Sequence, residues 1–264
     1  MSQIPPGSPW QQPPGYSNYP RASQSPDPYG RPPGIYFDTI GMAWNLVQAN
    51  LGTWVLSVLV AGIIMITISV GFSFGANLLL YGGLFYQGPP SITPYITGQL
   101  VSLVPNLIVG IFTSSLFYMG VKTARGEQIG VGDIFCGFSC FLPLMIAVFL
   151  QQLIVMVGLC LLVIPGIFLI GALAFVPLLV IDRNMNPIEA ITESYNVLRQ
   201  HAWSMFALLF VGALIYFLGA CLCGVGALFT HPIYLVIVGL TYNTFYPRVQ
   251  MVAQQQQIGI EPPR

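Results

Sequence analysis

The stretch of sequence that decides the fold runs from Phe141 to Trp203. It opens with 41 residues that carry no charge, FLPLMIAVFLQQLIVMVGLCLLVIPGIFLIGALAFVPLLVI, and turns polar at Asp182-Arg183. One membrane crossing needs about 20 apolar residues for a hydrocarbon core of roughly 30 Å, so this run is too long for one crossing and long enough for two. We therefore predict a tight helical hairpin with its turn at Pro165-Gly166, whose second helix ends at Asp182.

The polar segment that follows, NPIEAITESYNVLRQ from Asn186 to Gln200, has the pattern of an amphipathic helix. Asn186 stands at the cap position, Pro187 at the first helical position and Glu189 at the third, which is a strong helix start. Apolar and polar residues form opposite stripes at helical spacing: Ile188, Ile191, Tyr195 and Leu198 on one, Glu189, Glu193, Asn196 and Gln200 on the other.

Composition places the chain among integral membrane proteins. Of its 264 residues, 55% are hydrophobic and only 6% are charged, whereas soluble domains carry about 25% charged residues. The formal net charge is zero and no basic tract occurs, so the composition gives no support to nucleic-acid binding. The first 34 residues are polar, so we expect no cleavable signal peptide and an uncleaved first anchor.

Charge is sorted along the chain. If each apolar run is one crossing, every charged residue lies in an alternate set of loops on a single side, and the positive-inside bias makes that side the cytoplasm. The opposite face then carries no formal charge. The basic residues behind this assignment are Arg21, Arg31, Lys122, Arg125, Arg183, Arg199, Arg248 and Arg264.

The fold class we predict is all-α: a polytopic bundle of six transmembrane helices with cytoplasmic interfacial amphipathic helices and both termini in the cytoplasm. The expected crossings are Thr53 to Ala76, Leu100 to Val121, Leu142 to Val163, Pro165 to Ile181, Ala202 to Leu222 and Val225 to Tyr246. We expect Trp54 and Trp203 at the aromatic belt. Gly71 and Gly75 have the spacing that lets another helix pack closely, although glycine is also common in membrane helices generally.

Each helical hairpin follows a cytoplasmic amphipathic segment. These segments are Asp38 to Asn50, capped by Asp38 or Thr39, then Asp133 to Cys140, and the helix up to Gln200. The arrangement suggests three parallel repeats, as other membrane folds use, although any inward-to-outward crossing benefits from such an anchor.

The domain organisation has three parts. Residues 1–36 form a disordered, proline-rich cytoplasmic tail, because Pro-Pro-Gly repeats and tyrosines cannot bury enough apolar surface to fold. Residues 37–249 form the six-helix membrane domain, and residues 250–264 form a polar C-terminal tail. Within the first tail, Pro13-Pro14-Gly15-Tyr16 matches a WW-domain ligand, a match that chance also explains in this composition.

Several positions between Ile164 and Trp203 carry a resemblance to a known family. The residues concerned are Ile164, Pro165, Gly166, Ile167, Pro177, Leu178, Leu179, Val180, Asp182, Pro187, Ala190, Ser194 and Trp203. With them the chain resembles a large bacterial family of six-helix membrane proteins, which is similar to the membrane domain ahead of the catalytic domain in some glycerophosphodiester phosphodiesterases. Where relatives often carry glycine before the Trp-led helix, this chain has Gln200-His201-Ala202. The resemblance implies a fold and no reaction, because no phosphodiesterase domain follows residue 249.

Candidate chemistry is sparse. No predicted crossing carries an ionised residue in its middle, which disfavours ion-coupled transport. The neutral side chains of Asn77, Asn106, Gln151 and Gln152 either line a path for a small molecule or hydrogen-bond a neighbouring helix. On the cytoplasmic side Asp182, Glu189, Glu193 and His201 are near one another in sequence, and His231 is the ionisable candidate outside; boundary and helix-start roles explain them more simply than catalysis.

The five cysteines suggest structure more than chemistry. Cys136 and Cys140 are four residues apart, but no histidine or further cysteine completes a metal site, and we predict no metal or cofactor. Cys160 lies near the exterior end of its helix, as do Cys221 and Cys223, so a disulfide from Cys160 to either one is an alternative to buried free thiols.

The leading functional hypothesis is a non-enzymatic organiser or regulator of the envelope in a bacterial inner (cytoplasmic) membrane. Its expected partners are membrane lipids and membrane proteins bound through the N-terminal tail. The first alternative is a channel or carrier for a small neutral or amphipathic molecule. The second is an enzyme acting on lipid head groups at the cytoplasmic face.

Overall fold

The computed structural model describes residues 33–81, 92–221 and 226–247. All regular elements in these ranges are helical, as predicted. Five helical stretches are long and apolar enough to cross a membrane: Leu51–Ala76, Pro105–Ala124, Val131–Leu161, Val163–Arg183 and Ala202–Cys221. Most of the predicted N-terminal tail and all of the predicted C-terminal tail lie outside the described residues.

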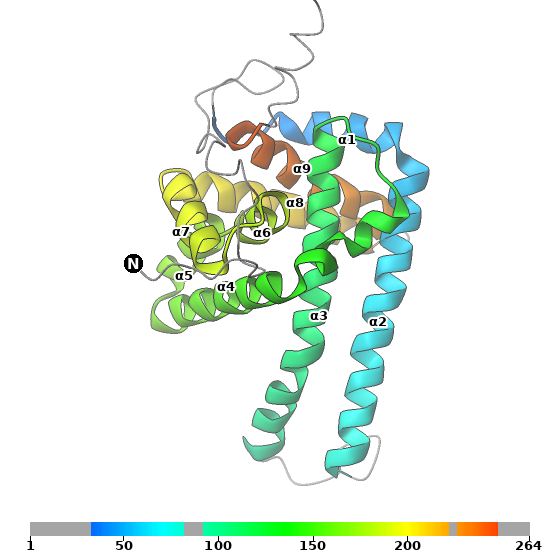
Figure 1. The fold of residues 1–264 in the computed structure, drawn as a ribbon, viewed down its shortest axis with the longest axis vertical. Helices are drawn as coiled ribbons and strands as arrows, with labels where there is room; N and C mark the ends of the chain where they lie inside the picture. The colour runs from blue at the N-terminus through cyan, green and yellow to red at the C-terminus, as the bar shows by residue number, and fades with distance from the viewer. Residues whose placement is uncertain (1–32, 82–91, 222–225, 248–264) are drawn as a thin grey trace, which may run out of the picture.

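The first half of the chain forms a long hairpin. Helix α1 (Thr39–Ala49) leads into α2 (Leu51–Tyr81), which pairs with α3 (Ile92–Ala124). Figure 1 shows that the far ends of α2 and α3 extend beyond the other helices. Along α2 large apolar side chains are exposed all round, which suits contact with lipid; they include Ile63, Ile66, Val70, Phe72, Phe74 and Leu78.

The second half packs against the near end of this hairpin. A 3₁₀ helix, η2 (Val131–Cys140), leads into α4 (Phe141–Leu161), and α4 runs across the long axis of α2 and α3 (Figure 1). The 3₁₀ helix is the predicted second amphipathic segment. It buries Ile134 and exposes Phe135 and Phe138.

Helix α9 (Ala227–Phe245) is the central helix of the molecule. It is buried from Pro232 to Phe245 except at half-buried Tyr234, and it packs on α3, on α8 (Ala202–Cys221) and on α1. At the crossing with α3 the two backbones touch at Gly120 and Gly239, where any side chain would collide with the opposite main chain. Protein surrounds α9, which explains why this predicted sixth crossing is more polar than the five apolar stretches.

The predicted turn of the central hairpin is displaced. The chain reverses at Leu162, whose backbone is extended (φ −156°, ψ 136°), and α5 (Val163–Ala172) begins directly after it. Pro165 lies in the first turn of α5, where its missing N–H costs nothing. Gly166 instead allows close packing, because a side chain there would collide with Leu159 of α4.

The predicted fourth crossing is two short helices. After α5 the chain makes a turn and continues as α6 (Val176–Arg183). Pro177 explains the break, since a proline inside a helix removes one backbone donor and its ring clashes with the preceding turn. At its far end α6 stops at Asn184, which adopts the left-handed conformation (φ 48°) that asparagine tolerates better than most residues.

Helix α7 (Pro187–Leu198) begins where predicted, with Asn186 as its N-cap residue, although the Asn186 side chain makes no capping hydrogen bond. The buried positions are Pro187, Ala190, Ser194 and Leu198, whereas Ile188 is 73% exposed. Small residues face inward because α7 lies directly against the break between α5 and α6.

Three further expectations on the first hairpin are corrected. Trp54 is fully buried in a cluster with residues of α1, α3, α9 and η2 and is not a belt residue, whereas Trp203 is 53% exposed. Asp38 has helical backbone angles and gives α1 no side-chain cap, while the Thr39 hydroxyl donates to the carbonyl of Tyr36. Gly71 and Gly75 contact no other helix of the described chain.

Candidate functional site

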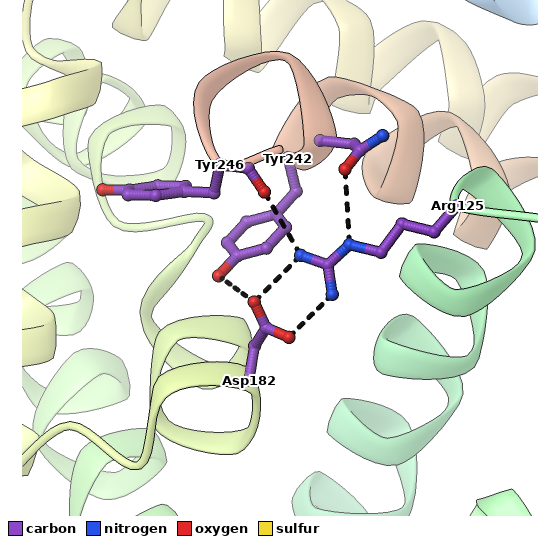
Figure 2. Close-up of polar contacts among 5 residues, drawn as sticks. Arg125, Asp182, Tyr242 and Tyr246 are labelled. Carbon is purple, nitrogen blue, oxygen red and sulfur yellow. Dashed lines mark hydrogen bonds and ion pairs between the residues drawn. The ribbon is translucent and has the colours of Figure 1, made fainter. Parts of the chain in front are cut away.

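A buried ion pair joins the ends of α3, α6 and α9. The Arg125 guanidinium contacts Asp182 through two hydrogen bonds, Nη1 to Oδ1 at 2.7 Å and Nη2 to Oδ2 at 2.9 Å. Both side chains are only 5% exposed. Figure 2 shows the guanidinium between Asp182 on one side and α9 on the other, so the pair connects three helices that are distant in sequence.

Helix α9 supplies the remaining partners of this pair. Arg125 Nη2 donates to the backbone carbonyl of Tyr246 (3.2 Å) and its Nε to Asn243 Oδ1 (3.3 Å). The Tyr242 hydroxyl donates to Asp182 Oδ2 (3.1 Å; Figure 2). Burial disfavours the charge on Arg125, but the hydrogen bonds and the negative charge of Asp182 outweigh it and raise the pKa of Arg125 above its ordinary value.

A second layer of contacts extends the network to α7. The Tyr246 hydroxyl donates to Glu193 Oε1 (3.2 Å), and the Arg183 guanidinium lies 4.4 Å from the centre of the Tyr246 ring. A buried pair with its hydrogen bonds satisfied holds elements in register more than it adds net stability. We interpret this network as a structural lock between α3, α6, α7 and α9.

The other ionisable candidates are placed apart from any shared reaction centre. Glu189 is exposed in the first turn of α7. The His201 ring packs on Phe245, with ring centroids 5.9 Å apart, and the His231 ring packs on Tyr216 at 5.1 Å.

The cysteines of the described residues are free thiols. Cys160 and Cys221 are both exposed and not bonded to each other, and Cys223 lies outside the described residues. Cys136 and Cys140 point to backbone carbonyls, of Ser115 (4.0 Å) and Gly137 (3.7 Å). Within the described ranges no three His, Cys, Asp or Glu side chains group closely enough to hold a metal ion.

A cavity of about 700 Å³ lies where α3 and α4 face the α5–α6 break. Most of its wall is apolar, for example Phe117, Val155 and Ile170. The polar lining comes from α3 and α4 and consists of Asn106, Thr113, Ser114, Gln151, Gln152 and Cys160. Among the described residues that line it, none is acidic, basic or a histidine.

The helix break forms part of the cavity wall and explains one of its polar residues. Because Pro177 has no N–H, the carbonyl of Leu173 loses its helical partner. Gln151 Nε2 donates to this carbonyl across the helix interface (3.0 Å), and both Gln151 and Pro177 line the cavity. The Val176 N–H also donates to the Leu173 carbonyl (3.2 Å), so Gln151 adds a second hydrogen bond that ties the break to α4.

Ser194 of α7 closes the same break from the opposite side. Its hydroxyl donates to the carbonyl of Ala172 (2.9 Å) and accepts the N–H of Phe175 (3.3 Å). Irregular backbone at membrane depth is tolerated where protein groups or a cavity satisfy it. Side chains from α4 and α7 therefore stabilise the break.

Three of the four neutral side chains singled out from the sequence meet at this cavity. Asn106, Gln151 and Gln152 line it, and Gln151 also bonds a neighbouring helix as the alternative hypothesis required. The side chain of Asn77 lies outside the described part of the structure. Sequence reasoning missed Thr113 and Ser114, whose only signal was two adjacent hydroxyls in an apolar run.

Comparisons with protein-family models, with curated proteins and with solved structures find no match to this chain. The likeness to the bacterial six-helix family therefore stays a prediction, and the site is interpreted from its own geometry.

Proposed function

We propose that this protein binds a small neutral or amphipathic molecule within the membrane, as a carrier or channel for it. The observation that carries the proposal is the uncharged cavity between α3, α4 and the α5–α6 break. Its volume is in the range of small-molecule sites, which are mostly apolar with a few polar groups that fix orientation. The broken helix beside it is a feature that membrane carriers use at their substrate sites.

The absence of charge in the lining defines the kind of molecule. An ion entering a low-dielectric site without a counter-charge loses several kcal/mol of hydration, on the order of 3 kcal/mol or more. Neutral amides and hydroxyls on an apolar wall instead suit a molecule with one polar and one apolar end.

The envelope-organiser hypothesis stays a prediction. It depends on the proline-rich tail, most of which lies outside the described residues, while the cavity is a feature that an organiser does not need. We therefore place the carrier ahead of it. We also propose that the protein is not an enzyme, because Asp182 and Glu193 are engaged in the structural lock.

We further propose a topology of six crossings in a bacterial inner membrane, with both termini in the cytoplasm. The lock supports one shared side for Arg125, Asp182, Arg183 and Glu193, since they meet in one network. Amphipathic α1, η2 and α7 then lie at the cytoplasmic interface, with exposed Trp44, Phe138 and Ile188 directed to the head groups.

The test uses the two exposed cysteines among the described residues of the native chain. Cys160 lines the cavity and Cys221 does not. Purified full-length protein is alkylated with a maleimide, with and without added lipid extract from the producing membrane, and peptide mass spectrometry measures both rates. We expect the extract to slow labelling of Cys160 at least fivefold and to leave Cys221 unchanged. Equal effects on both thiols would refute binding in the cavity.

A further inference from the structure

We infer that the occupant of the cavity is an uncharged lipid whose head group donates hydrogen bonds, in the chemical class of a long-chain alcohol. The inference rests on the proposed function and specifies its ligand. It follows from what the polar groups of the wall still offer once their bonds within the protein are counted.

Two hydroxyls of α3 have already used their hydrogens. Thr113 Oγ1 donates to the carbonyl of Val109 (2.9 Å), and Ser114 Oγ donates to the carbonyl of Gly110 (2.7 Å). A hydroxyl has one hydrogen and two lone pairs, so both oxygens remain as acceptors. Ser114 is only 4% exposed, which places one of these acceptors deep in the wall.

The orientation of the Gln151 side-chain amide follows from its hydrogen bond to Leu173. The carbonyl of Leu173 can only accept, so Gln151 must present its amide nitrogen to it (3.0 Å) and direct Oε1 elsewhere. Thr113, Ser114 and Gln151 thus add three acceptor oxygens to one cavity wall. Asn106 and Gln152 add amide groups that both donate and accept. A head group that only accepts hydrogen bonds could bond these N–H groups but would leave the three acceptor oxygens unmatched, whereas an alcohol, which donates and accepts, suits both.

Size and charge narrow the class further. The cavity, at about 700 Å³, has room for one long hydrocarbon chain and a small head group. An anionic head group would face acceptor oxygens and no cation among the described lining residues. The ligand that fits is therefore neutral, single-chained within the cavity, and hydrogen-bond donating.

The experiment compares three probes that share one chain: oleyl alcohol, oleyl methyl ether and oleyl phosphate. Protection of Cys160 in the full-length protein is titrated with each, and native mass spectrometry checks the adducts. We expect the alcohol to protect at a concentration about tenfold or more below that of the ether, which lacks a donor, and of the phosphate, which is charged.

A variant pair tests the acceptors directly. Thr113→Val combined with Ser114→Ala removes two acceptors without leaving a backbone carbonyl unbonded, because both carbonyls belong to the helix. The double variant should raise the alcohol concentration needed to protect Cys160 about tenfold and leave that of the ether unchanged. The matched control is Thr192→Val combined with Ser139→Ala, which removes the same kinds of hydroxyl from exposed sites outside the cavity. It should leave all three probes unchanged.

The outcomes separate this inference from the proposed function. If the ether or the phosphate protects Cys160 as well as the alcohol does, the cavity binds amphipaths and the inference is wrong. If the variant and its control behave alike, the acceptors do not select the ligand and the inference is again wrong. If no probe and no lipid extract protects Cys160, both the inference and the proposed function fail.

Discussion

At the scale of single residues, the structure depends on a few polar groups that neutralise one another inside an apolar protein. Arg125 and Asp182 form the strongest case, since each would be an uncompensated charge without the other. Gln151 and Ser194 play the same part for backbone carbonyls at the helix break. Substitution of any of these residues should therefore cost more stability than substitution of an exposed residue.

Removing one member of the buried pair should be severe. We expect Asp182→Ala to lower the free energy of unfolding by about 3–5 kcal/mol, because the Arg125 charge is left buried and unpaired. Arg125→Met combined with Asp182→Leu should recover only part of this, since Tyr242 and the Tyr246 carbonyl still lose partners. The measurement is the temperature at which the detergent-solubilised protein loses its monodisperse chromatographic peak.

The matched control for this prediction is another ion pair within the described residues. Lys122 and Asp133 lie 2.7 Å apart but are 23% and 19% exposed, and partly exposed pairs contribute about 1 kcal/mol or less. Lys122→Met should therefore change the melting temperature little. Equal losses from Asp182→Ala and Lys122→Met would contradict the role of the lock.

Gln151 and Gln152 are neighbours in sequence, but we expect only substitution of Gln151 to lower stability. Gln151→Met removes one of two donors to the Leu173 carbonyl, the other being the Val176 N–H, and should cost about 1 kcal/mol. Gln152→Met alters an exposed side chain for which the structure shows no such bond and should have little effect. Thermal stability of the two variants, measured side by side, checks this, and a larger loss for Gln152→Met would show the break to be held in another way.

At the scale of helices, the sequence predicts most elements and misses how they are broken and turned. Apolar runs and the charged residues at their ends give the positions of α2, α3, α4 and α8. The length needed to cross a membrane and the cost of placing a charge inside it can both be read from consecutive residues. The break between α5 and α6 was not predicted, since Pro177 alone is compatible with a kinked single helix. What decides it is Ser194 and Gln151, which come from other helices.

The side of α7 that faces the core does not follow from its amphipathic pattern. Hydrophobic periodicity ranks Ile188 above Ala190, yet the core takes the small residue because α7 approaches the break closely. Trp54 was assigned to the belt from its residue type, and its burial in a cluster with residues of α1, α3, α9 and η2 becomes visible only in the fold. Such facts depend on tertiary contacts that no single segment encodes.

Glycines give a prediction that separates packed from unpacked helix surfaces. Gly120 of α3 touches the α9 backbone, so Gly120→Leu should prevent the two helices from approaching and abolish the folded, monodisperse protein. Gly71 of α2 meets nothing within 4 Å, so Gly71→Leu should be tolerated. The yield of monodisperse protein is the readout, and loss of folding in Gly71→Leu would reveal a contact that this fold does not contain.

At the scale of the whole molecule, the membrane class of the protein follows from composition, while its cavity does not. Five apolar helical stretches could be anticipated from residue counts alone. The cavity is built from side chains of α3 and of the α4–α6 segment, and its uncharged lining becomes visible only when these are brought together.

The proposed topology can be tested on intact cells, in a chain whose native cysteines are replaced by serine. Leu162→Cys, at the reversal between α4 and α5, should react with an impermeant thiol reagent added outside. Gln128→Cys, between α3 and η2, should react only after the cells are permeabilised. Labelling of Gln128→Cys from outside would place the buried lock on the opposite side of the membrane and overturn the assignment.

The most direct test of a binding function for the cavity is to identify the lipid that copurifies with the folded protein. Mass spectrometry of protein extracted with its native membrane should find one uncharged amphipath enriched over the bulk lipids. Val155→Trp, which fills the cavity, should lose that lipid while remaining monodisperse. Bound lipids identical to the bulk membrane in both proteins would contradict a binding function for the cavity.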